Sequence, residues 1–78
     1  MSIPTREKAR WITAGYQDNI DRAPGANCPE PPNRIPYLNP AETEAHERRQ
    51  YARINAYWEG FYAATEDAFA KAQKQRNR

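Results

Sequence analysis

The feature that most constrains the fold is the stretch of chain after Pro40, which contains no further proline. Its large apolar residues recur at spacings of three and four, the period of one helical face. Ala, Glu, Arg and Lys, all good helix formers, fill most of the other positions. We therefore predict one long helix from about 40 to 74. Its expected buried stripe comprises Tyr51, Ile54, Trp58, Phe61, Thr65, Ala68 and Ala72.

Helix-start residues precede this stretch, because Asn39 can act as the N-cap, Pro40 suits the first helical position and Glu42 the third. A first helix is predicted from about 5 to 22, with Ser2 or Thr5 as its cap. Its apolar-leaning face contains Ala9, Ile12, Tyr16, Asn19 and Ile20. Gly15 lies at the edge of that face, where a close approach by another element would explain a residue that disfavours helices.

Residues 23–39 are predicted to form an extended linker, because with Pro40 they hold six of the seven prolines. We expect Ile35, Tyr37 and Leu38 in this linker to pack along a helix. The first helix and the apolar stripe have similar lengths, about 26 and 27 Å at 1.5 Å per residue. The expected fold is therefore all-α, a two-helix antiparallel hairpin forming one small domain over 1–78, although a helix-swapped dimer would satisfy the same lengths.

The composition leaves little apolar surface to bury, since the 78 residues have a mean hydropathy of -1.15. A partner or a second copy is expected to complete such a core, and we predict a homodimer with Tyr57, Gly60 and Ala64 as its seam. Cys28 is the only cysteine, which excludes an intramolecular disulfide and fits a reducing compartment. No apolar run approaches the ~18 residues of a membrane span. We expect a cytoplasmic protein without membrane contact.

No residue pattern indicates catalysis. His46 is the only histidine and lies among charged residues of the long helix, where a solvated surface position is expected. Together with Cys28 it provides too few ligands for a zinc site. No Gly-rich phosphate-binding loop follows a strand. We therefore expect neither an enzyme nor a bound metal or cofactor.

Binding is better indicated, because Arg49, Arg53 and Tyr57 recur every four residues along one flank of the long helix. Arginine beside aromatic rings can bind RNA by phosphate pairing and base stacking, or act as a protein-binding hot spot. Alternatively, Trp11 and Tyr57 seal the edges of a small core. The candidate binding residues are Arg10, Trp11, Tyr16, Gln17, Arg49, Arg53 and Tyr57.

Two short patterns carry a resemblance to a known family. The first helix contains Gly15-Tyr16-Gln17 and Ile20, followed by Cys28-Pro29, and the second contains Tyr57, Gly60-Phe61 and Ala64. Over about two-thirds of the chain this resembles the ribosome modulation factor family. The resemblance implies two helices joined by a loop, which bind the small ribosomal subunit and promote inactive ribosome dimers. A related branch of small plasmid and phage proteins has been linked to fluoroquinolone modification.

Two functions remain open from the sequence. The resemblance favours a small non-enzymatic regulator that binds ribosomal RNA or a ribosome-associated surface. The alternative is a protein-binding module, such as a phage-type accessory protein that inhibits a host protein through its Arg/aromatic flank. The charge of residues 41–70, six acidic side chains against three arginines, favours this alternative.

Overall fold

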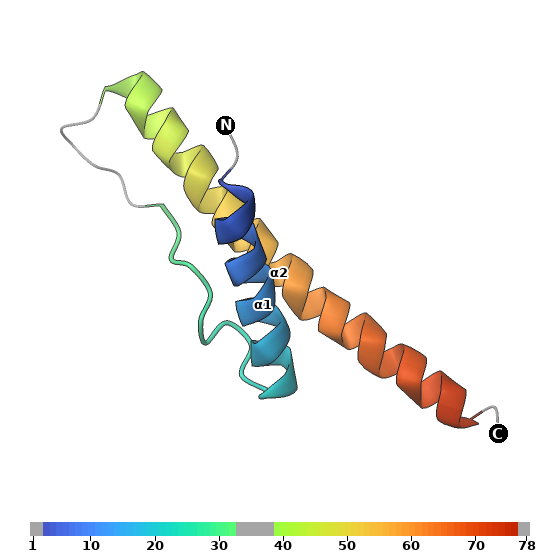
Figure 1. Cartoon of the computed structure of the whole chain (residues 1–78). Helices are drawn as coiled ribbons and strands as arrows, with labels where there is room; N and C mark the ends of the chain where they lie inside the picture. The colour runs from blue at the N-terminus through green and yellow to red at the C-terminus, as the bar shows by residue number, and fades with distance from the viewer. Residues whose placement is uncertain (1–2, 33–38, 77–78) are drawn as a thin grey trace.

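The computed structural model describes residues 3–32 and 39–76, which form two helices (Figure 1). Helix α1 spans Thr5–Ile20 and helix α2 spans Pro40–Arg76, each within two residues of the expected ends. The described residues contain no strand, so the predicted all-α fold of two packed helices is confirmed. Helix α2 extends beyond α1 at both ends, which makes the molecule elongated, 60 × 22 × 16 Å (Figure 1).

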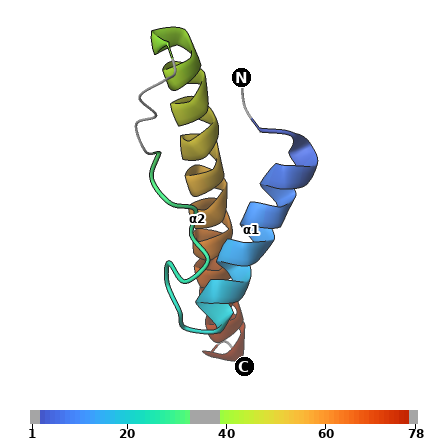
Figure 2. The same cartoon turned by 90° about the vertical axis from the view of Figure 1, so that its left-hand side faces the viewer.

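The two helices run in the same direction (Figure 2), whereas matched lengths led us to predict an antiparallel arrangement. Near the start of α1, Glu7 pairs with Arg53 of α2. Near its end, Asn19 donates a hydrogen bond to Thr65, further along α2. Contacts therefore advance together along both helices, and the predicted direction was wrong.

The linker explains why this arrangement is possible. The end of α1 lies beside Phe61 and Thr65 in the C-terminal half of α2, so the chain must return roughly 35–40 Å to begin α2. An extended chain from 21 to 39 can span about 59 Å at ~3.1 Å per residue. Gln50 Nε2 donates to the Glu30 carbonyl at 2.6 Å, so the linker at Glu30 lies beside the N-terminal part of α2. Ile35, Tyr37 and Leu38, expected to pack along a helix, lie outside the described residues.

The helix ends follow local chemistry. The Asn39 side-chain oxygen accepts a hydrogen bond from the Glu42 backbone N–H at 2.8 Å, as expected for an N-cap. Helix α1 instead follows Pro4 without a side-chain cap, with Thr5 as its first helical residue, and Ser2 lies outside the described residues. Helix α1 ends at Ile20, two residues before the expected end, and Arg22 has a positive φ of 56° that reverses the chain.

Two glycines lie where the helices touch. A Cβ at Gly15 would lie 1.8 Å from the Tyr57 carbonyl oxygen, and one at Gly60 would lie 1.8 Å from the Ile12 carbonyl oxygen. Only glycine fits at either position, because the two backbones are in direct contact. The close approach expected at Gly15 is confirmed. Gly60, which we expected to serve a second interface, belongs to this same contact.

The buried face of α2 is formed by Ala56, Tyr57, Gly60 and Ala64. Helix α1 covers this face, so it cannot be the dimer seam that we predicted. The predicted apolar stripe lies roughly 100° further round α2, and several of its members, including Tyr51, are exposed. Helical periodicity places the large rings on one common side, but close backbone packing selects the side with small residues.

Candidate functional site

A buried polar cluster joins α1, α2 and the start of the linker. Tyr57 is 0% exposed, and its hydroxyl donates to Asp18 Oδ2 at 2.5 Å. The same hydroxyl accepts a hydrogen bond from the Gly25 backbone N–H at 2.8 Å. Asp18, 2% exposed, also accepts hydrogen bonds from the backbone N–H and the side-chain amide of Asn27. Tyr57 was predicted as a binding residue; in the structure its side chain is buried, as the alternative of a residue that seals the core expects.

The cluster shifts the ionisation of both side chains. Burial, with the hydrogen bond to Asp18, raises the pKa of Tyr57 to about 12. The hydrogen bond from Tyr57 lowers the pKa of Asp18, and the two bonds from Asn27 add to this effect against the opposing effect of burial. The folded protein therefore favours a neutral Tyr57 beside an ionised Asp18. Asp18 was not predicted as a functional residue, since a single carboxylate within a helix gives no periodic signal.

The predicted Arg/aromatic flank of α2 does not form one exposed surface. Arg53 is half-buried, and its guanidinium Nε lies 3.2 Å from both carboxylate oxygens of Glu7 on α1. It also donates to the Gln50 side chain at 2.9 Å. Arg49 is exposed, and its Nε donates to the Ala45 carbonyl of its own helix. With Tyr57 buried, only Arg49 of this predicted trio is exposed.

The predicted residues of α1 lie on different sides of that helix. Glu7, Arg10 and Trp11 line a shallow hollow of about 300 Å³, where Arg10 is exposed and Trp11 is half-buried. Gln17 is exposed, and its side chain donates to Asp21 at 3.0 Å.

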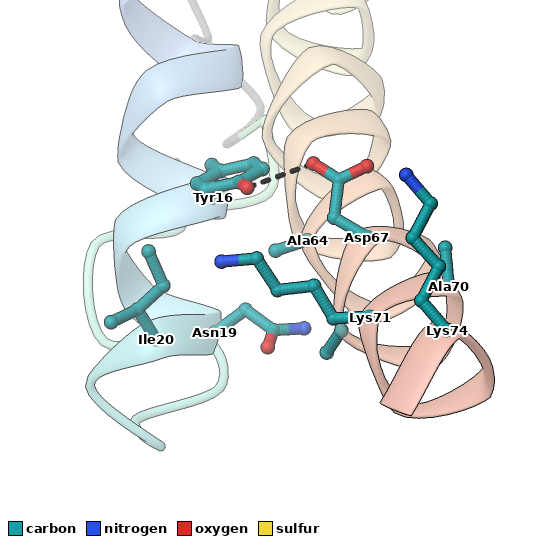
Figure 3. A pocket seen from close by; sticks show the side chains of 9 residues that line it. Tyr16, Asn19, Ile20, Ala64, Asp67, Ala70, Lys71 and Lys74 are labelled. Atoms are coloured by element: carbon teal, nitrogen blue, oxygen red, sulfur yellow. Dashed lines mark hydrogen bonds between the residues drawn. The ribbon is translucent and has the colours of Figure 1, made fainter. Parts of the chain in front are cut away.

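Tyr16 lies away from that hollow, in a groove between the C-terminal end of α1 and the C-terminal half of α2 (Figure 3). The groove has a volume of about 650 Å³. The residues that line it are Tyr16, Asn19, Ile20, Ala64, Asp67, Ala68, Ala70, Lys71 and Lys74. Tyr16 is therefore the only predicted binding residue in this groove.

Two lysines give the groove its positive charge. The Lys71 side chain extends toward α1 between Tyr16 and Asn19, and Lys74 lies on the Asp67 side (Figure 3). Neither ammonium forms an ion pair with any carboxylate in the part of the chain that the structure describes. Neither lysine was among the candidate binding residues, because the basic end of α2 is expected from the helix dipole as well as from nucleic-acid binding.

The Asp67 carboxylate faces these lysines and is hydrogen-bonded to Tyr16. The Tyr16 hydroxyl donates to Asp67 Oδ2 at 2.8 Å, and this hydrogen bond raises the pKa of Tyr16. Asn19 is held in place by hydrogen bonds to the Phe61 carbonyl and the Thr65 hydroxyl, both at 2.7 Å. The groove thus combines two cations, one hydrogen-bonded carboxylate and an aromatic ring, a combination suited to an anionic ligand.

Comparisons with protein-family models, with curated proteins and with solved structures find no match to this chain. Neither α1 nor α2 is long and apolar enough to cross a membrane, judged over the described residues. Within residues 3–32 and 39–76, no three His, Cys, Asp or Glu side chains are grouped so that they could hold a metal ion.

Proposed function

We propose that this protein is a small non-enzymatic regulator that binds ribosomal RNA or a ribosome-associated surface in the cytoplasm. The observation that carries this proposal is the groove in which Lys71 and Lys74 lie beside Tyr16, with no carboxylate of the described residues paired to either ammonium. Lysine ammonium groups bind phosphates as point charges. The ring of Tyr16, half-exposed at the groove, offers a surface on which a base can stack.

The position of the groove also agrees with the uneven charge along α2. An RNA backbone would be repelled by the acidic residues near the start of this helix. The groove lies at the opposite end, where Lys71, Lys74 and Arg76 follow Asp67 without another acid. The proposed contacts therefore differ from the Arg49–Arg53 flank that the sequence indicated, although the proposed class of partner is the same.

Co-sedimentation with ribosomes at several salt concentrations tests the proposal. Each phosphate contact displaces counterions and contributes about -0.7 to the slope of log K against log salt for single strands. The double variant Lys71→Gln/Lys74→Gln should flatten that slope by about 1.4 and weaken binding at low salt.

Lys8→Gln is the matched control, because Lys8 pairs with Glu59 at 3.9 Å outside the groove. This control should sediment with ribosomes like the unaltered protein. If the unaltered protein stays in the supernatant even at low salt, ribosome binding is wrong. If it sediments and the double variant does so equally well, the groove is not the binding surface.

A second candidate function is a protein-binding module that inhibits a host protein. The hollow beside Trp11 favours it, because tryptophan and arginine dominate protein-binding hot spots and Arg10 lines the same hollow. Trp11→Ala should then abolish nuclease-resistant binding to the partner, with little dependence on salt. Retention of binding by Trp11→Ala together with sensitivity to nuclease would favour the RNA proposal.

A further inference from the structure

The side of α2 roughly opposite α1 carries four aromatic residues. Tyr51, Tyr62 and Phe69 are 53%, 61% and 65% exposed, and Trp58 is half-buried. At 100° per residue, all four fall within a sector of about 40° around the helix. The Trp58 and Tyr62 rings have centroids 6.0 Å apart, so they form one continuous surface. We name this surface the aromatic stripe.

The positions in the aromatic stripe are symmetric along the helix. Tyr51 and Phe69 each lie nine residues from position 60, and Trp58 and Tyr62 each lie two residues from it. In an antiparallel pair of α2 helices with a two-fold axis beside position 60, residue i faces residue 120 minus i of the other copy. Tyr51 then faces Phe69 of the second copy, and Trp58 faces Tyr62. Every ring of the stripe meets another ring.

The charges of α2 favour the same orientation. Acidic Glu42, Glu44 and Glu47 lie near its start, whereas its last turn is basic. Antiparallel pairing brings the acidic end of each copy beside the basic end of the other, and a parallel pair would bring like charges together. Glu44 and Arg76 each lie sixteen residues from position 60, so they also face each other. Glu44 bonds Arg48 of its own helix through one carboxylate oxygen and retains the other.

The exposed area is sufficient for a modest interface. A fully buried aromatic side chain covers about 150–250 Å². Three rings more than half exposed therefore offer roughly 250–450 Å² per copy, before Trp58 and flanking side chains are added. Stable interfaces begin at about 600 Å² per partner. The stripe and its flanks approach this size, which corresponds to a weak, concentration-dependent association.

We propose that the aromatic stripe binds a second copy of this chain, with the two α2 helices antiparallel and the two-fold axis beside position 60. Helix α1 packs against Ala56, Tyr57, Gly60 and Ala64 on roughly the opposite side of α2, and the linker borders the stripe at Trp58, where Cys28 lies. The proposal does not rest on RNA binding, since the cationic groove lies on that other side as well. In the proposed homodimer the two copies meet at the aromatic stripe, whereas the sequence predicted contact through the Tyr57–Gly60–Ala64 face.

Sedimentation equilibrium of the full chain tests the association. We expect a monomer–dimer equilibrium in the micromolar range, with the dissociation constant of the double variant Tyr62→Glu/Phe69→Glu raised by ~100-fold or more. Both side chains are exposed, so the variant should retain the helical circular dichroism of the original chain. Thr13→Glu adds an exposed charge on α1, outside both the stripe and the groove, and should dimerise normally. A monomer at every concentration, or a dimer that tolerates the double variant, overturns the proposal.

Cysteine cross-linking tests the orientation, with Cys28→Ser removing the native thiol. Chains carrying Tyr51→Cys and chains carrying Phe69→Cys should form a mixed disulfide when combined. Each alone should form little disulfide, because antiparallel copies hold like positions roughly 27 Å apart along the helix. Efficient disulfides within each single variant would indicate parallel copies and overturn the proposed arrangement.

Discussion

At the scale of single residues, Tyr57 contacts both α1 and the linker from its position on α2. Its hydroxyl donates to Asp18 of α1 and accepts from the Gly25 N–H of the linker, while its backbone meets Gly15. One side chain therefore connects both helices and the linker. Arginine and aromatic residues at four-residue spacing suggested a binding surface for Tyr57, yet the same spacing is compatible with burial.

Tyr57→Phe should destabilise the fold by about 1–3 kcal/mol, because the buried Asp18 loses one hydrogen-bond donor without a replacement. Chemical denaturation at neutral pH measures the change. Tyr62→Phe is the matched control, since the exposed Tyr62 should contribute less than about 0.5 kcal/mol. Equal stability of the two variants would contradict the structural role of the Tyr57 hydroxyl.

Tyr57 also predicts how stability depends on alkaline pH. Its pKa is raised from 10.0 to about 12 by folding, so the folded state favours the protonated form. Its contribution is complete below pH 10 and is lost as the pH rises toward 12. Tyr57→Phe should reduce this loss, measured by denaturation at several pH values. Because Tyr16 also has a raised pKa, Tyr16→Phe is needed to separate the two contributions.

Asp18 predicts the opposite dependence at acid pH. Its pKa is lowered from 3.8 by folding, so its contribution is complete above about pH 4 and is lost as the pH falls through the lowered value. Asp18→Asn should weaken this acid dependence in the same denaturation series. If the stability of Asp18→Asn falls at acid pH as steeply as that of the unaltered protein, other carboxylates control acid unfolding.

At the scale of the elements, the contact between α1 and α2 depends on Gly15 and Gly60. Both permit backbone contact that alanine would prevent, so helix propensity and packing act in opposite directions at these positions. A Cβ at 1.8 Å from a carbonyl oxygen cannot be accommodated without separating the helices. We therefore expect the loss of helix–helix packing to outweigh the gain in helix propensity when alanine replaces either glycine.

Gly15→Ala and Gly60→Ala should each lower the melting temperature, with a loss of about 1–3 kcal/mol, despite the ~1 kcal/mol that alanine gains in helix propensity. Thermal unfolding followed by circular dichroism measures the effect. The reverse substitution Ala70→Gly, at an exposed position of α2, measures the stability that glycine costs through helix propensity away from the contact between the helices. A raised melting temperature for either glycine variant would show that the helices do not touch there.

The sequence predicted the helices better than their packing. Proline positions and the Asn39 cap locate both elements to within two residues, because these signals act locally. The buried face of α2 was not predicted, since the expected stripe that begins at Tyr51 has a stronger apolar signal than the Ala56–Gly60–Ala64 face. Of the candidate site, Tyr16 was predicted as a binding residue, but its position beside Lys71 and Lys74 was not, because the groove exists only where α1 ends against α2.

At the scale of the whole molecule, the parallel arrangement depends on the length of the linker. Helix α1 and the apolar stripe expected on α2 have similar lengths, which either direction satisfies, whereas a short connection would allow only the antiparallel one. The described part of the linker contacts Gln50 at Glu30, and α2 begins at Pro40. The length of the linker, more than its contacts, permits both helices to run the same way.

Deletion of residues 29–38 should therefore abolish the packing of α1 on α2. Cys28 lies near Trp58, roughly 28 Å along α2 from Asn39, and a single peptide unit spans only about 3.8 Å. Loss of the near-ultraviolet circular dichroism of the aromatic residues, with a non-cooperative melt, is the expected result. The matched control replaces the same ten positions with glycine and serine, which retains the length and should preserve cooperative melting. An antiparallel pair would tolerate the deletion, because its linker joins neighbouring helix ends, so a cooperative melt of the deleted chain would contradict the parallel fold.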